Sequence, residues 1–264
     1  MHSDSLIVDP KHLRRLARDG QHSGITAGLC PGYVQTNLAI LPRELAFEFL
    51  LFCQRNPKPC PLIEVIESGN TEPAKTAPGA DIRTDAPSYR VFRDGELEAE
   101  VPDITLHWKD DMVSFLLGCS FTFEAALVHA GVPVRHVESG KNVSMFISNL
   151  ETTPAGPFYG PMVVTMRPIP RDKIVRAVQV SSRFPDVHGA PIHVGDPEAI
   201  GITDLSNPDM GDPVDIKDGE VPVFWACGVT PQVVAVRSKP SIMITHTPGH
   251  MFVTDLKDET LAIF

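Results

Sequence analysis

One stretch of the chain, residues 221–251, gathers the side chains that acid–base and nucleophilic chemistry require. It offers a thiol, a hydroxyl at an expected helix start and two imidazoles, and histidine is the side chain that titrates near neutral pH. We take the two histidines as candidates for general acid and base, and the cysteine as a further catalytic candidate. The alternative is a small buried cysteine and two rings that face different ways. The residues concerned are Cys227, Thr230, His246 and His250.

A second stretch, residues 113–131, is similar to residues 221–239. Each reads as an apolar run, a small residue, a cysteine, a small residue and then a helix start. If the likeness is real, two equivalent loops present a thiol each, Cys119 and Cys227, beside the free N–H groups of a helix N-terminus. Such loops suit a small dicarboxylate. We therefore place substrate contacts at the neighbouring residues Gly118, Ser120, Gly228 and Thr230.

A substrate carboxylate also needs a cation, and two arginines are candidates. Arg83 or Arg135 could hold a carboxylate through two parallel hydrogen bonds. The alternative for Arg83 is a structural ion-pair network with the aspartates on either side of it. Polar residues that follow a strand often line the site of an open α/β sheet, and a strand is expected at 132–137. The further candidates for substrate contacts are Asp81, Glu138 and Asn142.

The totals exclude several classes of protein. The chain has 264 residues and a formal net charge of -10, which argues against nucleic acid or an anionic membrane surface as the main partner. No run of 18 apolar residues predicts a membrane span. The five cysteines form no C-x-x-C pair, so we expect a reduced, cytoplasmic protein without a zinc ribbon. We also expect a homo-oligomer.

No cofactor is predicted, and the question of a divalent metal stays open. Four histidines and two aspartates could serve as ligands, but none of their spacings is diagnostic of a metal site. They are His188, His193, His246 and His250, with Asp81 or Asp196.

Local patterns predict the elements that position these residues. The many prolines and glycines predict short elements and many turns. Residues 156–212 read as a smaller inserted domain, which makes the main domain discontinuous, with residues 1–155 and 213–264. The main elements expected are strands at 112–117, 132–137, 160–168, 221–225 and 242–244, a hairpin at 89–101, and helices at 43–56, 121–130 and 230–237.

Several motifs spread over nearly the whole chain resemble one family. They include Gly79-Ala80-Asp81-Ile82-Arg83-Thr84-Asp85, Leu117-Gly118-Cys119-Ser120-Phe121, His188-Gly189-Ala190-Pro191, Trp225-Ala226-Cys227-Gly228-Val229-Thr230-Pro231 and Pro248-Gly249-His250-Met251. Together they resemble the D-glutamate cyclase family, whose bacterial members often carry provisional hydro-lyase names.

The resemblance implies a reaction and a fold. D-glutamate would lose water and close to 5-oxo-D-proline, which makes the protein a carbon–oxygen lyase of amino-acid metabolism acting on a small amino acid or carboxylic acid. The fold implied is α/β, with a three-layer α/β/α main domain and a smaller two-layer α+β domain. Two alternatives stay open: a cofactor-independent racemase or epimerase that uses two cysteines, and a non-catalytic protein that binds small carboxylates.

Overall fold

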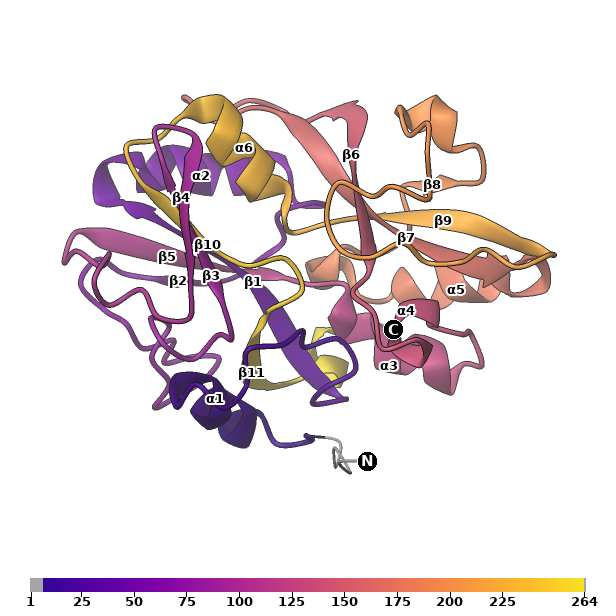
Figure 1. Cartoon of the computed structure of the whole chain (residues 1–264), viewed down its shortest axis with the longest axis horizontal. Helices are drawn as coiled ribbons and strands as arrows, with labels where there is room; N and C mark the ends of the chain where they lie inside the picture. Colours follow the sequence, from indigo (N-terminus) through magenta and orange to yellow (C-terminus); the bar gives the residue numbers. More distant parts are fainter. Residues whose placement is uncertain (1–6, 264) are drawn as a thin grey trace.

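Two antiparallel β-sheets lie side by side in the protein, and helices pack on their faces (Figure 1). The structure is a computed structural model that describes residues 7–263. The mixed α/β class predicted from the sequence is confirmed. Every pairing between the named strands of this part of the chain is antiparallel. The rule for open parallel sheets, which placed Glu138 and Asn142 after a strand, therefore does not apply.

The larger sheet is built around one long buried strand, β1, which is apolar toward its C-terminal end and carries the buried polar residues Gln35, Thr36 and Asn37 in its first half. Its strand order is β2-β5-β1-β10-β3-β4, and β11 pairs with β1 beyond the end of β10. The strands are β1 (Tyr33–Pro42), β2 (Leu62–Ile66), β3 (Tyr89–Arg93), β4 (Glu96–Val101), β5 (Met112–Gly118), β10 (Met243–His246) and β11 (Phe252–Lys257).

The smaller sheet has the order β6-β7-β9-β8. Its strands are β6 (Ser144–Glu151), β7 (Pro161–Pro170), β8 (His193–Val194) and β9 (Glu220–Ala226). Strands β6 and β9 lie outside residues 156–212, so this sheet extends past that segment on both sides. The domain boundaries drawn from the sequence and the layers implied by the resemblance stay predictions.

Six α-helices cover the sheets in the described part of the chain. The helices expected at 43–56, 121–130 and 230–237 are confirmed, as is the hairpin of β3 and β4. The helices are α1 (Pro10–Arg18), α2 (Arg43–Arg55), α3 (Phe121–His129), α4 (Arg135–Glu138), α5 (Ile174–Ser181) and α6 (Thr230–Ser238).

The strand predicted at 132–137 is wrong, because this segment ends in the short helix α4. Val132 and Val134 are buried in a core with Phe123 of α3 and Trp225 of β9, so their alternation reflects packing against these elements rather than strand pairing. A short run of alternating apolar residues fits both structures. Only the packing partners decide between them.

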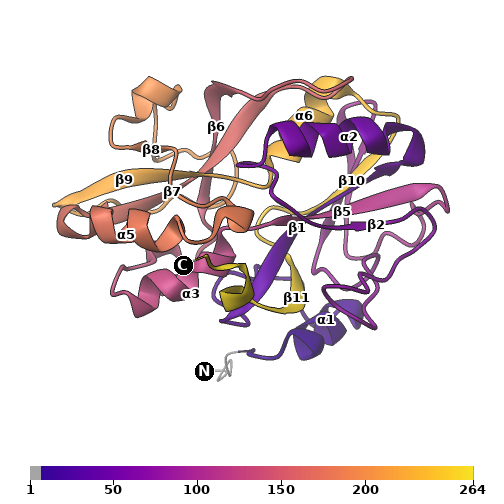
Figure 2. The ribbon, with the colours of Figure 1, turned by 180° about the vertical axis from the view of Figure 1, so that it is seen from behind.

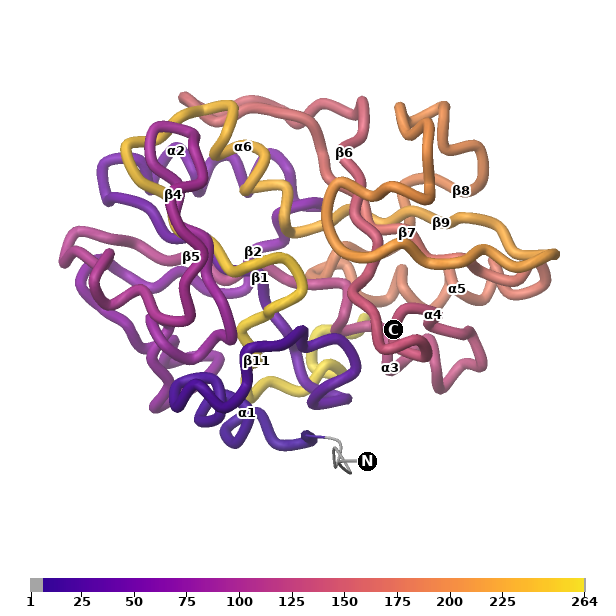
Figure 3. Tube along the Cα trace, viewed as in Figure 1, coloured from indigo at the N-terminus to yellow at the C-terminus, as the bar shows by residue number. Residues whose placement is uncertain are grey.

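The helices α3 and α6 each cross from one sheet to the other. Helix α3 follows β5 of the larger sheet, yet its Phe123 and Leu127 pack in a core with Trp225 of β9 in the smaller sheet. Helix α6 follows β9, yet its Val234 and Ala235 pack in a core with residues of α2 and β5. Figures 2 and 3 show the chain running from β9 into α6, which lies beside α2 over the larger sheet. The two crossings are therefore reciprocal, and each passes through a cysteine.

No helix among residues 7–263 is long and apolar enough to cross a membrane.

Candidate active site

The two reciprocal crossings meet at one side chain of β1, that of Asn37. Asn37 is 2% exposed, and its Nδ2 donates a 2.7 Å hydrogen bond to the carbonyl of Gly118, directly before Cys119. A Cβ atom at Gly228, directly after Cys227, would lie 1.9 Å from the same Nδ2. Only glycine permits this close approach. The amide of Asn37 therefore touches both cysteine loops, and the sequence analysis did not single it out.

The two cysteines occupy equivalent positions, as their similar sequences suggest. Cys119 and Cys227 are each 7% exposed and belong to one apolar cluster with Phe121 and Met251. The N–H of Phe121 donates to the sulfur of Cys119, 3.5 Å away, and the N–H of Val229 donates to the sulfur of Cys227.

Burial controls the charge state of both thiols. It raises the pKa of Cys227 to about 11 and the pKa of Cys119 further still, although the neighbouring N–H group of each lowers it in part. A thiolate is the nucleophilic form of cysteine. Both sulfurs are therefore protonated near neutral pH in this conformation.

His246 ends β10 and is held as a neutral hydrogen-bond donor. Its Nδ1 accepts the N–H of Leu38 at 3.1 Å, while the Leu38 carbonyl lies farther away at 3.5 Å. Because Nδ1 accepts, the proton resides on Nε2, which is buried and has no partner. Burial lowers the pKa of His246 to about 3, so the ring is neutral. An unpartnered buried N–H costs free energy, which an acceptor on a bound molecule would recover.

His250 has the opposite tautomer. Its Nδ1 lies 3.1 Å from the carbonyl of Pro248, and because a carbonyl can only accept, this nitrogen carries the proton. In the neutral form of the ring, the Nε2 atom then presents a lone pair. His250 is half-buried, and its charge is one of the factors that lower the pKa of His246. The two imidazoles therefore offer one donor and one acceptor at neighbouring points.

The loop that carries the two histidines is fixed by residues distant in sequence. Asn142, which follows α4, donates from Nδ2 to the carbonyl of Pro248 at 3.0 Å, and a Cβ atom at Gly249 would lie 2.3 Å from this amide. On the other side, Thr26 donates its hydroxyl to Gly249 and accepts the N–H of Met251. Asn142, predicted from the sequence as a substrate contact, thus reaches the histidine loop and packs against its backbone.

Residues 113–255, more than half of the chain, match the family described as D-glutamate cyclase. A protein from Thermoanaerobacter sp. (strain X514) is 65% identical over 255 residues, which cover 97% of this chain and 96% of the relative. The chain belongs to the D-glutamate cyclase family.

Other relatives agree with this assignment. A protein from Stutzerimonas stutzeri (strain A1501) is 62% identical over 97% of both chains, and one from Bacillus subtilis (strain 168) is 59% identical over 96% of this chain and 99% of the relative. All three relatives carry provisional hydro-lyase names. A solved nitrogen repressor-like protein from Methanococcus jannaschii, with a TM-score of 0.39 and 10% identity over 93% of this chain and 98% of its own, supports no conclusion.

A cation that the sequence analysis missed lies beside His246 in this cyclase-family chain. Gln232 of α6 donates from Nε2 to the carbonyl of His246 at 2.8 Å. Its Oε1 lies 3.4 Å from a guanidinium nitrogen of Arg90 on β3. The charge of Arg90 contributes to the lowered pKa of His246. Arg90 is therefore a positive group close to the unpartnered imidazole donor.

The two hydroxyls predicted to contact substrate have partners within the protein. Thr230 donates to the carbonyl of Cys227 at 2.7 Å and accepts the N–H of Val163 at 3.0 Å, so its oxygen holds the second cysteine loop. Ser120 accepts a hydrogen bond of 2.9 Å from Arg167. In this bond the Ser120 oxygen is the acceptor, so its hydroxyl proton is not used here.

A buried charged network lies behind the first cysteine loop, and sequence patterns did not reveal it. Arg167 of β7 is completely buried and donates from Nε to Glu124 at 3.0 Å, and His136 lies 3.1 Å from the same carboxylate oxygen. Burial acts to raise the pKa of Glu124, but the charges of His136 and Arg167 outweigh it and the pKa is lowered. The network fixes the first turn of α3.

The predicted arginine clamps are bound to carboxylates of the protein. Arg83 pairs with Asp81 at 2.7 Å and lies over the ring of Trp108, 5.9 Å from its centroid. Arg135 pairs with Glu220 and, at 3.3 Å, with Glu138. Both arrangements fit structural ion pairs, which was the stated alternative for Arg83. Arg90 likewise pairs with a carboxylate, that of Glu100, at 2.9 Å, and the positive group closest to the first cysteine loop in these contacts is Arg167, which binds Ser120.

Residues 7–263 contain no group of three or more histidine, cysteine or carboxylate side chains placed to hold a metal ion. The ring of His188 has its Nδ1 2.6 Å from the carbonyl of Lys58, and His193 has its Nε2 2.7 Å from the carbonyl of Asp196. These two histidines are therefore engaged by carbonyl groups of the backbone.

Proposed function

We propose that this protein closes D-glutamate to 5-oxo-D-proline with the loss of water, a hydro-lyase reaction. Membership of the D-glutamate cyclase family supports the reaction. The observation that carries the residue assignment is the pair of opposite tautomers, His246 with a free donor and His250 with a free acceptor. One acidic and one basic group at a single site are what ring closure needs.

The reaction moves two protons and exchanges one bond for another. The amine nitrogen attacks the γ-carboxyl carbon, a C–N bond forms and a C–O bond breaks. The ammonium group gives up two protons in becoming an amide, and the departing carboxylate oxygen takes up two in becoming water. No external reductant, oxidant or proton source is required. The protein must accept a proton from the amine, stabilise the developing oxyanion and protonate the leaving oxygen.

The two histidines, Arg90 and the cysteine loops can fill these roles. His250 Nε2 accepts the two protons of the ammonium group one after the other and returns each of them to the leaving oxygen, which departs as water. His246 Nε2–H donates a hydrogen bond to the oxyanion, and a neutral imidazole can do this without losing its proton. Arg90, whose Nε is paired with Glu100 at 2.9 Å, holds the remote carboxylate with its other guanidinium N–H groups. The N-terminal N–H groups of α3 and α6 add a favourable field for negative charge.

The two thiols enter this scheme as neutral groups in contact with the substrate. Their raised pKa values disfavour a thiolate in the free protein. The five cysteines are all unbridged, which supports a reducing compartment such as the cytoplasm.

A second candidate, a racemase that uses the two cysteines, is supported by the equivalence of the two loops. It would remove the α-proton with one thiolate and return it from the other thiol. It therefore requires exchange of the α-proton with solvent, which ring closure does not.

The test is incubation with D-glutamate and, separately, L-glutamate in deuterated water, with 5-oxoproline followed by chiral chromatography and mass spectrometry. We expect 5-oxo-D-proline from the D isomer, without deuterium at the α-carbon. Deuterium incorporation that is lost in Cys119→Ser and Cys227→Ser would support the racemase. Saturable binding of glutamate without any product would indicate a binding protein.

Two variants test the roles of the histidines. His246→Phe and His250→Phe should each lower kcat by 100-fold or more. Added imidazole should restore part of the activity of the His250 variant, because that ring is half-buried and a small base can replace it. Added imidazole should not restore activity to the His246 variant, because the ring of His246 is fully buried. His107→Phe, in a loop after β4, is the matched control. Full activity in either site variant would exclude its assigned role.

A further inference from the structure

The outer face of α2 leaves large apolar side chains in contact with solvent. Phe47 is 70% exposed and Leu50 is 38% exposed, while every other phenylalanine among residues 7–263 is buried. Leu50 and the half-buried Leu51 follow Phe47 by three and four positions, so the three side chains are neighbours on the helix surface. A contiguous apolar patch, unlike a single exposed residue, is typical of an interaction surface.

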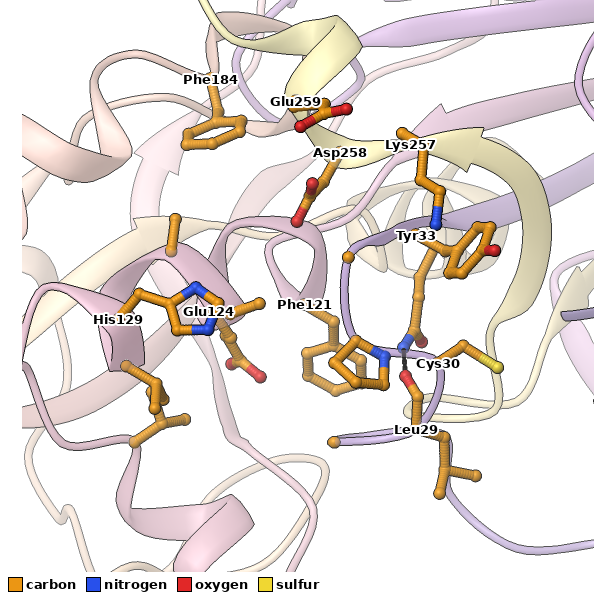
Figure 4. Close-up of a pocket in the computed structure, with 18 of the residues that line it drawn as sticks. Leu29, Cys30, Tyr33, Phe121, Glu124, His129, Phe184, Lys257, Asp258 and Glu259 are labelled. Carbon is orange, nitrogen blue, oxygen red and sulfur yellow. Dashed lines mark hydrogen bonds between the residues drawn. The ribbon is translucent and has the colours of Figure 1, made fainter. Parts of the chain in front are cut away.

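The patch lies away from the concave parts of the surface. A cavity of about 720 Å³ is enclosed by the loop at residues 28–33, by α3 and by the chain after β11 (Figure 4), and no residue of α2 lines it. Figure 2 shows α2 on the outside of the molecule, with no other element over it. A small ligand needs a concave site that removes most of its surface from water. The outer face of α2 therefore suits another protein surface rather than a small molecule.

The charges at the two ends of α2 favour a second copy of the same helix. Glu44 is exposed near the start of α2 and Arg55 is exposed at its last residue, and neither forms an ion pair within residues 7–263. Arg55 uses one guanidinium nitrogen to bind the carbonyl of Pro154, which leaves its other N–H groups for a partner. A second α2 that runs antiparallel brings opposite charges together at both ends.

The spacing of the polar residues fits a two-fold axis at the middle of α2. Glu44 and Arg55 are eleven residues apart, about three helical turns, and therefore lie on one flank of the exposed face. Arg43 and Gln54 have the same separation and lie on the other flank. A two-fold axis perpendicular to a pair of antiparallel helices keeps each flank on its own side. Glu44 then faces Arg55 of the second copy, and Arg43 faces the neutral amide of Gln54.

The available area indicates a weak dimer. A standard interface buries about 800 Å² on each partner, and α2 is only about 20 Å long. The loop at residues 153–160 enlarges the surface, because Asn56 at the end of α2 binds the carbonyl of Thr153 and the same loop exposes Tyr159. We therefore expect an association that depends on protein concentration.

We propose that α2 forms the interface of a homodimer in which the α2 helices of two copies pack antiparallel about a two-fold axis. Phe47 of each copy packs against Leu51 of the other, and two Glu44–Arg55 pairs close the ends of the interface. None of the residues assigned to the reaction lies on α2. The interface therefore does not depend on the proposed function.

The test is sedimentation equilibrium of the full chain over a wide range of protein concentrations. We expect the average mass to rise from 28.8 kDa toward twice this value as the concentration increases. Phe47→Asp should weaken the association at least 10-fold, whereas Val175→Asp, at a 67% exposed position on α5, should leave it unchanged. A mass of one chain at every concentration, or equal effects of the two substitutions, would overturn the proposal.

Charge reversal tests the antiparallel arrangement. Glu44→Arg and Arg55→Glu should each weaken the association several-fold, and more at low salt, because each sets like charges against each other at both ends. The double variant carries both reversals and should restore the association. Both positions are exposed, so the variants should fold. A double variant that associates no better than the single variants would exclude this pairing, whether or not D-glutamate is turned over.

Discussion

The amide of Asn37 lies in direct contact with the backbone of Gly228, in a space that has no room for a side chain. A Cβ atom at position 228 would lie 1.9 Å from Asn37 Nδ2 and 2.7 Å from its Oδ1. Asn37 also binds the carbonyl of Gly118. One residue of the central strand therefore sets the separation of the two cysteine loops.

Gly228→Ala should disturb both loops at once. The added methyl group must displace the Asn37 amide, which overpacks the interior and costs about 1–3 kcal/mol of unfolding free energy. Activity should fall more than stability does, because the loops move apart. Chemical denaturation and the rate of 5-oxoproline formation measure the two effects.

The same contact can be isolated by a second substitution. In the Asn37→Ala background, the added methyl group of Gly228→Ala meets no amide, so its further cost should shrink well below its cost alone. Gly24→Ala is the control, since its Cβ would meet only ordinary contacts. Equal costs in both backgrounds would show that the clash is not with Asn37.

The protein should lose stability in mild acid because two histidines are buried in neutral form. Burial lowers the pKa of His246 to about 3 and of His188 to about 4, from 6.5 in an unfolded chain. Below pH 6.5 the unfolded chain therefore binds more protons than the folded one. The unfolding free energy should fall by about 1 kcal/mol per pH unit for each histidine, down to about pH 4 for His188 and pH 3 for His246.

Denaturation midpoints between pH 5 and pH 8 measure this effect. His188→Asn should remove about half of the slope, and asparagine tolerates the positive φ of 85° at this position. His12→Asn, on the exposed face of α1, should leave the slope unchanged. A slope that His188→Asn does not alter would mean that other groups cause the acid sensitivity.

The thiols should react slowly in the folded protein. All five cysteines are free and buried, and burial raises the pKa of Cys30, Cys60, Cys119 and Cys227. A disulfide reagent that reports released thiolate should therefore detect little reaction until denaturant is added, and then five equivalents. Rapid labelling of Cys119 or Cys227 in the native state would instead indicate an activated thiolate and favour the racemase.

Arg167→Met should destabilise the protein by about 3–5 kcal/mol, because it leaves the buried carboxylate of Glu124 without its guanidinium partner. Arg167 also lies near the rings of Phe123 and Trp225, 5.5 Å and 5.4 Å from their centroids. Chemical denaturation is the measurement. The double variant with Glu124→Gln should recover part of the loss, and Arg176→Met, on exposed α5, should cost little. No recovery in the double variant would show that the charge pairing is not the cause.

Local sequence determined much of the scaffold. The apolar runs of β5 and β9, the small residues after them and the starts of α3 and α6 follow from patterns a few residues long, and they predicted two equivalent cysteine loops. The residue type of His246 and His250, rather than their spacing, made them candidates for acid and base. Extended motifs also indicated the family, which the comparisons confirmed.

The tertiary structure decided which of these residues meet and in what chemical state. Asn37 has no motif around it, and it matters only because residues near 118 and 228 fold onto it. The tautomer of His246 depends on the N–H of Leu38, 208 residues away in the chain. The sequence left Arg83 open between a substrate clamp and an ion-pair network with the aspartates beside it, and the fold pairs it with Asp81. Long-range packing sets burial, hydrogen-bond partners and therefore charge, and no local pattern contains that information.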